Sequence, residues 1–448
     1  MTSTTPPVPG DGRLETPLGI LPIYREAAPR DLGWVAIIRV PLILSALLAL
    51  SAVFAVAPLR DAQTGVAEGR LRLPLGYIVF APLGDVLDAM STLSVRQHVA
   101  LMVTELALYA MWRTRRRRFR LSPRPSLLAE FAGATAVVLS LAGAYLVLTL
   151  VDRPMSALDI SNPDEVIVDF HSHTNASWDG RRSFTDERNR AWHEAAGFDV
   201  AYVTDHLPSD RVTASVPPAR GLGHTLLLPS FEIECQGMHV VVLGASPAEA
   251  RAWCNGDQPD WLDGSGASGA LSSSAVVIGT LPGQLDQLAH ADVSSMEVVD
   301  GSPRALEQLA REDSRVMAVA DRYGLSLVTG SNLHGWGRTA VAWTAIEIPG
   351  WRALSPEALD ATIRAHLRAR PDGAVHVIER RRVRPGESAV SLVSTLPDVA
   401  WNMLVMMSPS ERLSWMIWIW LIWVGSQTLT RRARLGVSRP DSDRCRIP

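Results

Sequence analysis

VDFHSHTNASWDG, residues 168–180, is the stretch on which the fold depends. β-Branched and aromatic residues lead up to His171, and His173 and Asp179 follow within nine residues of it. A short apolar run of this kind indicates a buried strand, and the loops that follow strands build the sites of parallel barrels. The stretch therefore predicts a strand that places two imidazoles and a carboxylate at one edge of a sheet.

Further β-rich runs follow in the segment 161–385, with helical stretches between several of them. The runs lie at residues 166–170, 200–203, 225–228, 275–278, 296–299 and 325–329. The clearest helix is Pro303–Tyr323, with Gly324 as its end. Strands that alternate with helices predict a parallel α/β architecture, and about 225 residues suffice for one barrel.

Several of these runs are followed by side chains that can bind a metal ion. They are Asp205 and His206 after the second run, Glu232 after the third, and Asn332 and His334 after the sixth. His239 is an exception, because it opens a strand. Buried ionisable groups are costly unless they have partners, and a shared metal would supply the partner. The other histidines are expected to be surface or helix residues: His193, His224, His290, His366 and His376.

Apolar segments outside this domain predict a protein of the cell membrane. The predicted spans are residues 34–59, 127–151 and 413–429, with a weaker candidate at 97–112. A helix needs about 20 predominantly apolar residues to cross a bilayer. Residues 97–112 fit either a fourth span or an amphipathic helix on the membrane surface. We therefore expect a protein that crosses the membrane several times and contacts the lipid bilayer.

Basic runs give the predicted orientation. Residues 113–126 contain seven arginines, and RRAR occupies 431–434. Short loops this basic stay in the cytoplasm, although such a run could also bind phosphate or anionic lipid. Both tails, 1–33 and 430–448, and the loop 113–126 are then cytoplasmic, and the membrane region covers 34–151. The domain 161–385 lies outside the cell, and 386–412 connects it to the last span or lies at the interface.

The composition narrows the possibilities further. The 43 basic and 46 acidic residues give a net charge of −3, so the whole chain carries no footprint of nucleic-acid binding. The three cysteines form no zinc-finger spacing, so a metal here must rely on imidazole and carboxylate. The sequence leaves the oligomeric state open.

The segment 161–385 resembles the PHP (polymerase and histidinol phosphatase) superfamily of metal-dependent phosphoesterases. The matching features are HSH followed by an SDG-like turn, TDH at 204–206, Glu232 in LLPSFEIEC at 227–235, a histidine that opens the next strand, and GSNLH at 330–334. The resemblance covers none of the predicted spans. It implies a distorted (β/α)7 barrel, which would be joined here to about four transmembrane helices.

Carried over by position, the resemblance implies up to three metal sites. The first would use His171, His173, Glu232 and Asn332, the second Glu232 and His239, and the third Asp179, His206 and His334. Asn332 stands where the family has aspartate, and Leu281 stands where it has a histidine. We therefore expect one or two divalent ions, zinc, manganese or iron, with the third site the most intact.

The implied activity is hydrolysis of a phosphate ester by metal-activated water. The residues implied in catalysis are His171, His173, Asp179, His206 and Glu232, and Arg338 would either clamp phosphate oxygens or form a salt bridge at the barrel rim. The substrate would be a phosphorylated small molecule or an envelope-linked phosphate. An impaired barrel that binds or senses a phosphorylated ligand is the alternative, and hydrolysis of an amide or another ester is a third possibility.

Overall fold

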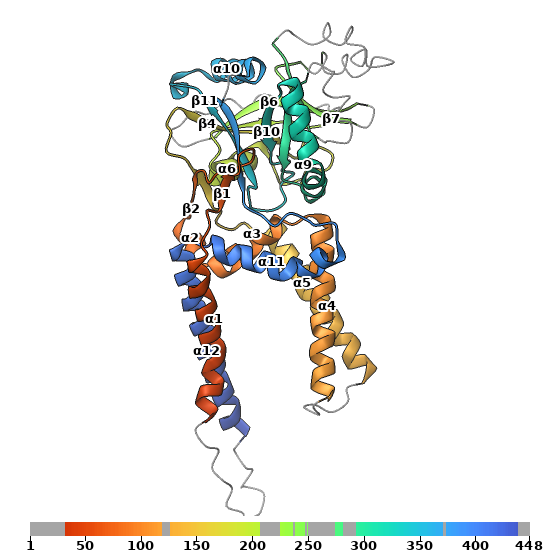
Figure 1. The fold of residues 1–448 in the computed structure, drawn as a ribbon, viewed down its shortest axis with the longest axis vertical. Coiled ribbons are helices and arrows are strands. Elements are labelled where there is room, and N and C mark those ends of the chain that lie inside the picture. The colour runs from red at the N-terminus through yellow and green to blue at the C-terminus, as the bar shows by residue number, and fades with distance from the viewer. Residues whose placement is uncertain are drawn as a thin grey trace, which may run out of the picture.

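A mixed α/β domain with a curled ten-stranded sheet forms one part of the molecule, and long helices extend from it (Figure 1). The computed structural model describes residues 32–118, 126–206, 225–235, 238–246, 249, 274–280, 293–370 and 373–437. The predicted tails 1–33 and 430–448 lie largely outside the described residues, as does part of the basic loop.

The ten strands lie in the order β1-β12-β11-β4-β5-β6-β7-β8-β9-β10. They are β1 (Leu59–Asp61), β4 (Glu165–Ser172), β5 (Val200–Val203), β6 (Leu226–Cys235), β7 (Met238–Leu243), β8 (Val276–Gly279), β9 (Val293–Asp300), β10 (Ser326–Gly330), β11 (Ala342–Glu347) and β12 (Val375–Arg380). All six predicted runs coincide with strands of this sheet. A second, two-stranded sheet pairs β2 (Arg70–Arg72) with β3 (Ala157–Asp159).

The pairing is mixed, so the prediction of a parallel sheet was correct only in part. The groups β4-β5-β6 and β8-β9-β10 are parallel. In contrast, β7 is antiparallel to β6 and β8, and β11 is antiparallel to β4 and β12. Only residues 236–237 separate β6 from β7, whereas parallel neighbours need a connection of about a dozen residues or more.

The sheet curls until the end of β10 lies beside β4. Asn332 N donates a hydrogen bond to His171 O at 2.7 Å, and His173 N donates to Leu333 O at 2.9 Å. Gly330 permits this approach, because a Cβ there would lie 2.3 Å from the Cβ of His171. The HSH and SNLH motifs are therefore adjacent, although about 160 residues separate them in the chain.

The helices of the sheet domain are α6 (Asp186–Ala196), α9 (Pro303–Tyr323), α10 (Pro356–Ala369) and the 3₁₀ helix η4 (Trp351–Ala353). The prediction for α9 is confirmed at both ends. The Ser302 hydroxyl accepts a hydrogen bond from Ala305 N at the first turn, and Gly324 ends the helix with a φ of 60°.

The other helices extend below this domain in the view of Figure 1. They are α1 (Leu32–Val53), α2 (Leu75–Val79), α3 (Ala81–Ser91), α4 (Val95–Arg118), α5 (Leu127–Leu150), α11 (Ala389–Met406) and α12 (Pro409–Val437). The helices α1 and α12 run side by side, with Trp420 Nε1 3.3 Å from Ser45 Oγ. The helices α4 and α5 form a second pair, joined by an ion pair of 2.8 Å between Arg113 and Glu130. Helices α3 and α11 lie crosswise between these pairs and the sheet.

Among the described residues, α5 is long and apolar enough to cross a membrane on its own. Residues 390–406 and 409–429 meet the same criterion only together, and they bend by 117° where they join. Residues 38–53 are apolar but form a shorter helix. These helices indicate membrane association.

The bounds of the predicted spans agree with some of these helices and differ from others. The span predicted at 34–59 is too long, because α1 ends at Val53 and Leu59 is a fully buried residue of β1. The candidate at 97–112 lies within α4, the segment 386–412 contains α11, and 413–429 lies within α12.

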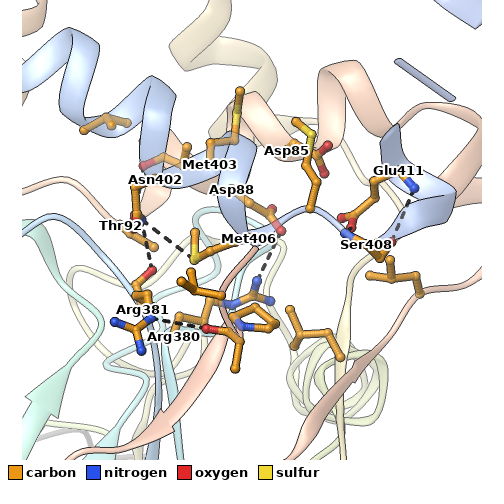
Figure 2. Close-up of a pocket in the computed structure, with 18 of the residues that line it drawn as sticks. Asp85, Asp88, Thr92, Arg380, Arg381, Asn402, Met403, Met406, Ser408 and Glu411 are labelled. Carbon is orange, nitrogen blue, oxygen red and sulfur yellow. Dashed lines mark hydrogen bonds and ion pairs between the residues drawn. The ribbon is translucent and has the colours of Figure 1, made fainter. Parts of the chain in front are cut away.

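A cavity of about 430 Å³ lies at the junction between the sheet domain and the helices (Figure 2). Apolar side chains of α11 form one wall, and the ionisable residues Asp85, Asp88, Arg380 and Glu411 also line the cavity. Asp88 accepts hydrogen bonds from Arg153 at 2.6 Å and from the hydroxyl of Thr339 at 2.8 Å. One buried carboxylate of α3 thus connects the helices to the sheet domain.

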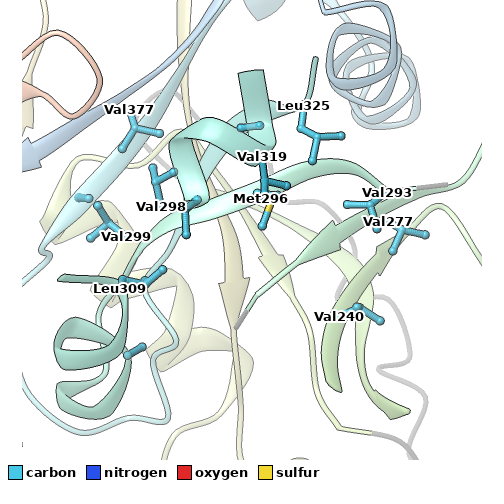
Figure 3. Packing of buried hydrophobic residues seen from close by; sticks show 14 of the residues in the cluster. Val240, Val277, Val293, Met296, Val298, Val299, Leu309, Val319, Leu325 and Val377 are labelled. Carbon is cyan, nitrogen blue, oxygen red and sulfur yellow. The ribbon is translucent and has the colours of Figure 1, made fainter. Parts of the chain in front are cut away.

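One of the two main core clusters packs α9 against the strands β7, β8 and β9 (Figure 3). Met296 and Val298 of β9 are buried in it, beside Leu309 and Val319 of α9. Because side chains alternate along a strand, Glu297 points to the opposite face from Met296 and Val298. The packing of β9 therefore fixes the position of a carboxylate that faces the candidate site.

Candidate metal centre

Three side chains from β4 and β6 meet in a triangle of possible ligand atoms. His171 Nε2 lies 3.0 Å from His173 Nε2 and 3.1 Å from Glu232 Oε2, and His173 Nε2 lies 3.2 Å from the same oxygen. Ligand bonds of about 2.0–2.2 Å place neighbouring ligand atoms roughly 3.0–3.5 Å apart. The triangle therefore has the size of one face of a metal coordination sphere.

Glu232 is the centre of a larger cluster. Its Oε2 also lies 3.3 Å from His206 Nδ1, and its Oε1 lies 2.7 Å from His239 Nδ1. Burial opposes ionisation of Glu232, but the neighbouring His171 and hydrogen bonds from three histidines outweigh it and hold its pKa well below the usual range. Burial also lowers the pKa of His173 well below its ordinary value. Burial lowers the pKa of His171 as well, but the neighbouring Glu232 and Glu297 outweigh it and raise the pKa well above its ordinary value. Because a neutral imidazole and an ionised carboxylate are the forms that bind metal, a cation would displace the proton of His171.

A second group lies beside the first and contains the three residues predicted for the third site. Asp179 Oδ2 lies 3.1 Å from His334 Nε2 and 3.5 Å from His206 Nε2. The ring of His173 stacks on that of His334, with centroids 4.0 Å apart. One ring nitrogen each of His173, His206 and His334 lies within 4.8 Å of the other two. The two groups are therefore contiguous and share His206.

The chemistry of these side chains fits a divalent cation. Asp179 Oδ1 and His334 Nε2 are buried and have no hydrogen-bond partner, although both side chains have ionisable neighbours. Several atoms with lone pairs thus face one another, and a cation between them would remove the repulsion. Mixed imidazole and carboxylate ligands suit zinc, manganese and iron.

Asn332, the neutral residue at an expected ligand position, lies at the edge of this cluster. It has a φ of 45°, its Nδ2 donates to Asp300 Oδ2 at 2.9 Å, and its Oδ1 is buried with no hydrogen-bond partner. An amide oxygen left free in this way can serve as a ligand, so the role of Asn332 stays a prediction. Leu281 and His290 lie outside the described residues.

Two carboxylates of β9 complete the surroundings and were not predicted. Glu297 Oε1 lies 3.1 Å from His171 Nδ1, and oxygen atoms of Glu297 and Asp300 approach His171 closely enough to form a third possible ligand group. Burial raises the pKa of Glu297 to about 8, although His171 acts in the opposite direction. A carboxylate on the far nitrogen of a ligating histidine fixes the ring. The signal in the sequence is an acidic residue inside the apolar run MEVV, residues 296–299.

A further layer holds the strand ends in place. Asp169 Oδ1 accepts hydrogen bonds from His171 N and Ser331 N, and its Oδ2 lies 2.7 Å from His193 Nε2. His193 is on helix α6, in agreement with the expectation of a surface or helix residue, but it is fully buried and takes part in the support of the site, which was not expected. It was missed because its carboxylate partner is distant in sequence. His376 pairs with Glu68 at 3.0 Å.

Asp205 supports the loop after β4. It accepts hydrogen bonds from Thr174 N and Thr174 Oγ1, both at 2.7 Å, and from Ser177 Oγ at 2.9 Å. Ser177 Oγ in turn lies 3.1 Å from His173 Nδ1. Asp205 therefore positions this loop, and through Ser177 it also positions His173.

Arg338 lies at the rim, beside the chain that enters the sheet domain. Its Nε donates to Arg153 O at 3.4 Å, and its guanidinium lies 3.9 Å from Asp152 Oδ1. These contacts correspond to the salt bridge that was one of the two alternatives for Arg338. Its contact with the phosphate of a substrate stays a prediction.

No family model and no curated protein matches the chain. Among solved structures, the chain is similar to PsfC from Pseudomonas syringae PB-5123. The sequence identity is 16%, the match covers 54% of this chain and 99% of PsfC, and the TM-score is 0.34.

Proposed function

We propose that the chain is a membrane-anchored, metal-dependent phosphoesterase whose domain 161–385 is a distorted (β/α)7 barrel. The observation that carries the proposal is the surroundings of Glu232 Oε2, which lies 3.1, 3.2 and 3.3 Å from nitrogen atoms of His171, His173 and His206. A buried carboxylate that meets three imidazoles at a strand end is arranged for metal-assisted hydrolysis.

His171, His173 and Glu232 would hold one cation, and Asp179, His206 and His334 a second, with His239 and Asn332 as further ligands. Bound there, a divalent cation supplies Lewis acidity toward phosphoryl oxygens and lowers the pKa of water. The protein orients its imidazoles for this: Glu297 and Ser177 occupy the Nδ1 atoms of His171 and His173, which leaves the Nε2 atoms facing Glu232.

The exposure of the imidazoles gives the direction from which a substrate would enter. The side chains of His171 and His173 are 1% and 0% exposed, whereas those of His206, His334 and His239 are 13%, 18% and 29% exposed. His171 and His173 therefore form the floor of the site. A phosphate ester would approach from the side of His239 and His334.

We further propose that α1, α4, α5 and α12 cross the cell membrane, with the barrel outside and both termini inside. The ends of α1, α4 and α12 that lie nearest the termini or the arginine run are far from the sheet in Figure 1. Arginines at the end of α4 favour a cytoplasmic position for that end. A substrate at the outer face would be a phosphorylated small molecule or an envelope-linked phosphate.

The second candidate function is an impaired barrel that binds or senses a phosphorylated ligand. The observation that favours it is Asn332, a neutral amide where the resembling family carries an anionic ligand. A weaker pull on the cation would lower its occupancy and with it the rate of hydrolysis.

One experiment separates the two functions. The full chain, purified in nanodiscs, is assayed for metal by mass spectrometry and for turnover of phosphomonoesters and phosphodiesters. The double variant His171→Ala, His173→Ala is compared with His366→Ala, which removes a histidine of α10 far along the chain from the cluster. We expect wild type and His366→Ala to contain metal and to turn over, and the double variant to do neither. Little or no metal without turnover in wild type would refute the hydrolase and favour the binding function, and metal with turnover that survives in the double variant would refute the assignment of the site.

A further inference from the structure

A second hollow, of about 230 Å³, lies next to the loops that carry Asp179 and His334. Three guanidinium side chains line it, from Arg181, Arg188 and Arg338, with one carboxylate, Asp152. Its floor includes Phe184 and Trp192. The proposed chemistry at the metal cluster does not use this hollow.

The hollow is formed where the membrane helix α5 meets the two site loops. Arg181 N donates to His334 O at 2.9 Å, and Gly337 N donates to Thr149 O, in the last turn of α5, at 3.3 Å. Trp192 Nε1 donates to Gly337 O at 3.2 Å. Gly335, with a φ of 84°, lets the loop pass Phe184, because a Cβ there would lie 2.5 Å from the Cβ of Phe184. The walls are therefore held by hydrogen bonds and close packing.

The charges that line this hollow do not balance. Asp152 lies 3.9 Å from Arg338, and its side chain is 76% exposed, so solvent screens this ion pair. Arg181 has a long contact of 3.5 Å to Gly335 O and lies over the ring of Trp336. Among the described residues, no carboxylate forms an ion pair with Arg181 or Arg188. Burial, the largest influence on Arg338, lowers its pKa, which means that its positive charge is incompletely compensated.

We propose that this hollow binds a phosphate group that is carried by a molecule at the membrane surface, beside the phosphate that is hydrolysed. Arginines recognise phosphate through paired N–H donors, and three around one small hollow can surround such a group. Thr149 and Val151 place the hollow at the end of a predicted span, where lipid headgroups are found. The inference that the hollow recognises part of the substrate rests on the proposed function. Phosphate binding in the hollow does not itself require hydrolysis.

The test uses the full chain in phosphatidylcholine nanodiscs, stripped of metal with a chelator. Inorganic phosphate is titrated, and its affinity is measured by calorimetry. The variants are Arg188→Ala and Arg338→Ala, and the matched control is Arg182→Ala, an exposed arginine next to Arg181 that does not line the hollow. His173→Ala reports binding at the metal cluster instead. We expect each hollow variant to weaken phosphate binding at least about tenfold, with both controls unchanged.

Two results would overturn the proposal: no saturable binding to wild type, or an equal loss in His173→Ala, which would place the phosphate among the histidines. Arg188 is exposed, so its variant retains the fold even if Arg338→Ala does not. Nanodiscs that contain phosphatidic acid show whether the phosphate group in the hollow comes from a lipid headgroup or from a soluble molecule. Competition with inorganic phosphate would show that a lipid headgroup enters the hollow, and its absence would assign the hollow to a soluble phosphate. Turnover by the metal-loaded chain is measured separately, so failure of the proposed function is distinguishable.

Discussion

Two regions of the molecule bury several charges each, and they do so in opposite ways. At the junction, Asp88 accepts hydrogen bonds from Arg153, Thr339, Tyr77 and Ser156, and Arg380 lies 3.6 Å away. In the metal cluster, Glu232 faces imidazoles whose nitrogen atoms also face one another. The junction surrounds Asp88 with arginines and hydroxyl groups, whereas the cluster surrounds Glu232 with imidazoles that can also bind a metal ion.

The unpartnered atoms show the same contrast. At the junction they include Nε and Nη1 of Arg153, which belong to a guanidinium that already binds Asp88. In and around the cluster they include the acceptors Asp179 Oδ1, Asn332 Oδ1 and Glu297 Oε2. The spare donors at the junction belong to a guanidinium that already binds a carboxylate, whereas the spare acceptors around the cluster are oxygen atoms of the kind that bind a cation. Burial therefore leaves different kinds of polar atom without partners in the two regions.

The largest effect is expected from Glu232→Gln, which keeps the shape of the side chain and removes the negative charge. A cation in the cluster would lose its central anionic ligand, and its affinity should fall at least about 10³-fold, or about 4 kcal/mol. Metal affinity is measured by competition with a chelator. Glu347→Gln, at the exposed end of β11, is the control. An unchanged affinity would mean that the cluster is a structural network like the junction.

The reverse experiment is Asp88→Ala. It leaves Arg153 and Arg380 buried without their shared carboxylate, which should lower the free energy of unfolding by about 3 kcal/mol. Metal content per folded molecule should not change. Asp313→Ala, which removes the half-exposed partner of Arg384, should change stability by less than about 1 kcal/mol. Denaturant unfolding gives both values, and a loss of metal in Asp88→Ala would show that the two regions are not independent.

The sequence predicted most of the cluster because its ligands stand at the ends of recognisable strands. His171, His173 and Glu232 each follow an apolar run, and strand ends in such a sheet lie near one another. Glu297 was missed because it interrupts a strand, and its partner His171 is 126 residues away. Asp169 and His193 were missed for the same reason, since a buried pair gives no local signal.

Hydropathy also misplaced part of the junction. Leu59 was predicted to end a membrane span, but it pairs with Arg380 at the edge of the sheet. An apolar residue has the same hydropathy in lipid and in a protein core, so the composition alone cannot separate the two. The antiparallel strands β7 and β11 likewise depend on connection lengths and pairing partners, which the β-rich runs do not encode.

A smaller effect is expected from Glu297→Gln, which tests whether the cluster has a supporting layer. If Glu297 orients His171, the amide should weaken metal binding by about 10- to 100-fold without removing it. The affinity is measured as for Glu232→Gln, with Glu347→Gln again as the control. A loss of metal affinity as large as that of Glu232→Gln would indicate that Glu297 binds the metal directly. An unchanged affinity would indicate that Glu297 only packs in the core.

The smallest effect concerns Asp85, a junction carboxylate that forms no ion pair with an arginine among the described residues. It accepts a hydrogen bond from Trp415 Nε1 at 2.8 Å, and it shares the Tyr77 hydroxyl with Asp88, each carboxyl lying 3.0 Å from the hydroxyl oxygen. Burial first, and then the neighbouring Glu411, raise its pKa from 3.8 to about 8. The junction would therefore neutralise Asp88 with arginines and Asp85 with a proton, whereas the cluster would use a metal.

The sign of the pH dependence follows from that shift. Because the folded state binds the proton more tightly than the unfolded state, the stabilisation is complete below about pH 4 and is lost as the pH rises toward 8. Asp85→Asn stays neutral throughout, so its free energy of unfolding should change less between pH 5 and 8. At pH 8 it should exceed that of wild type. Asp313→Asn serves as the exposed control. Parallel curves for wild type and Asp85→Asn would show that the junction tolerates an unpaired carboxylate, and the contrast between the two regions would then hold only for Asp88.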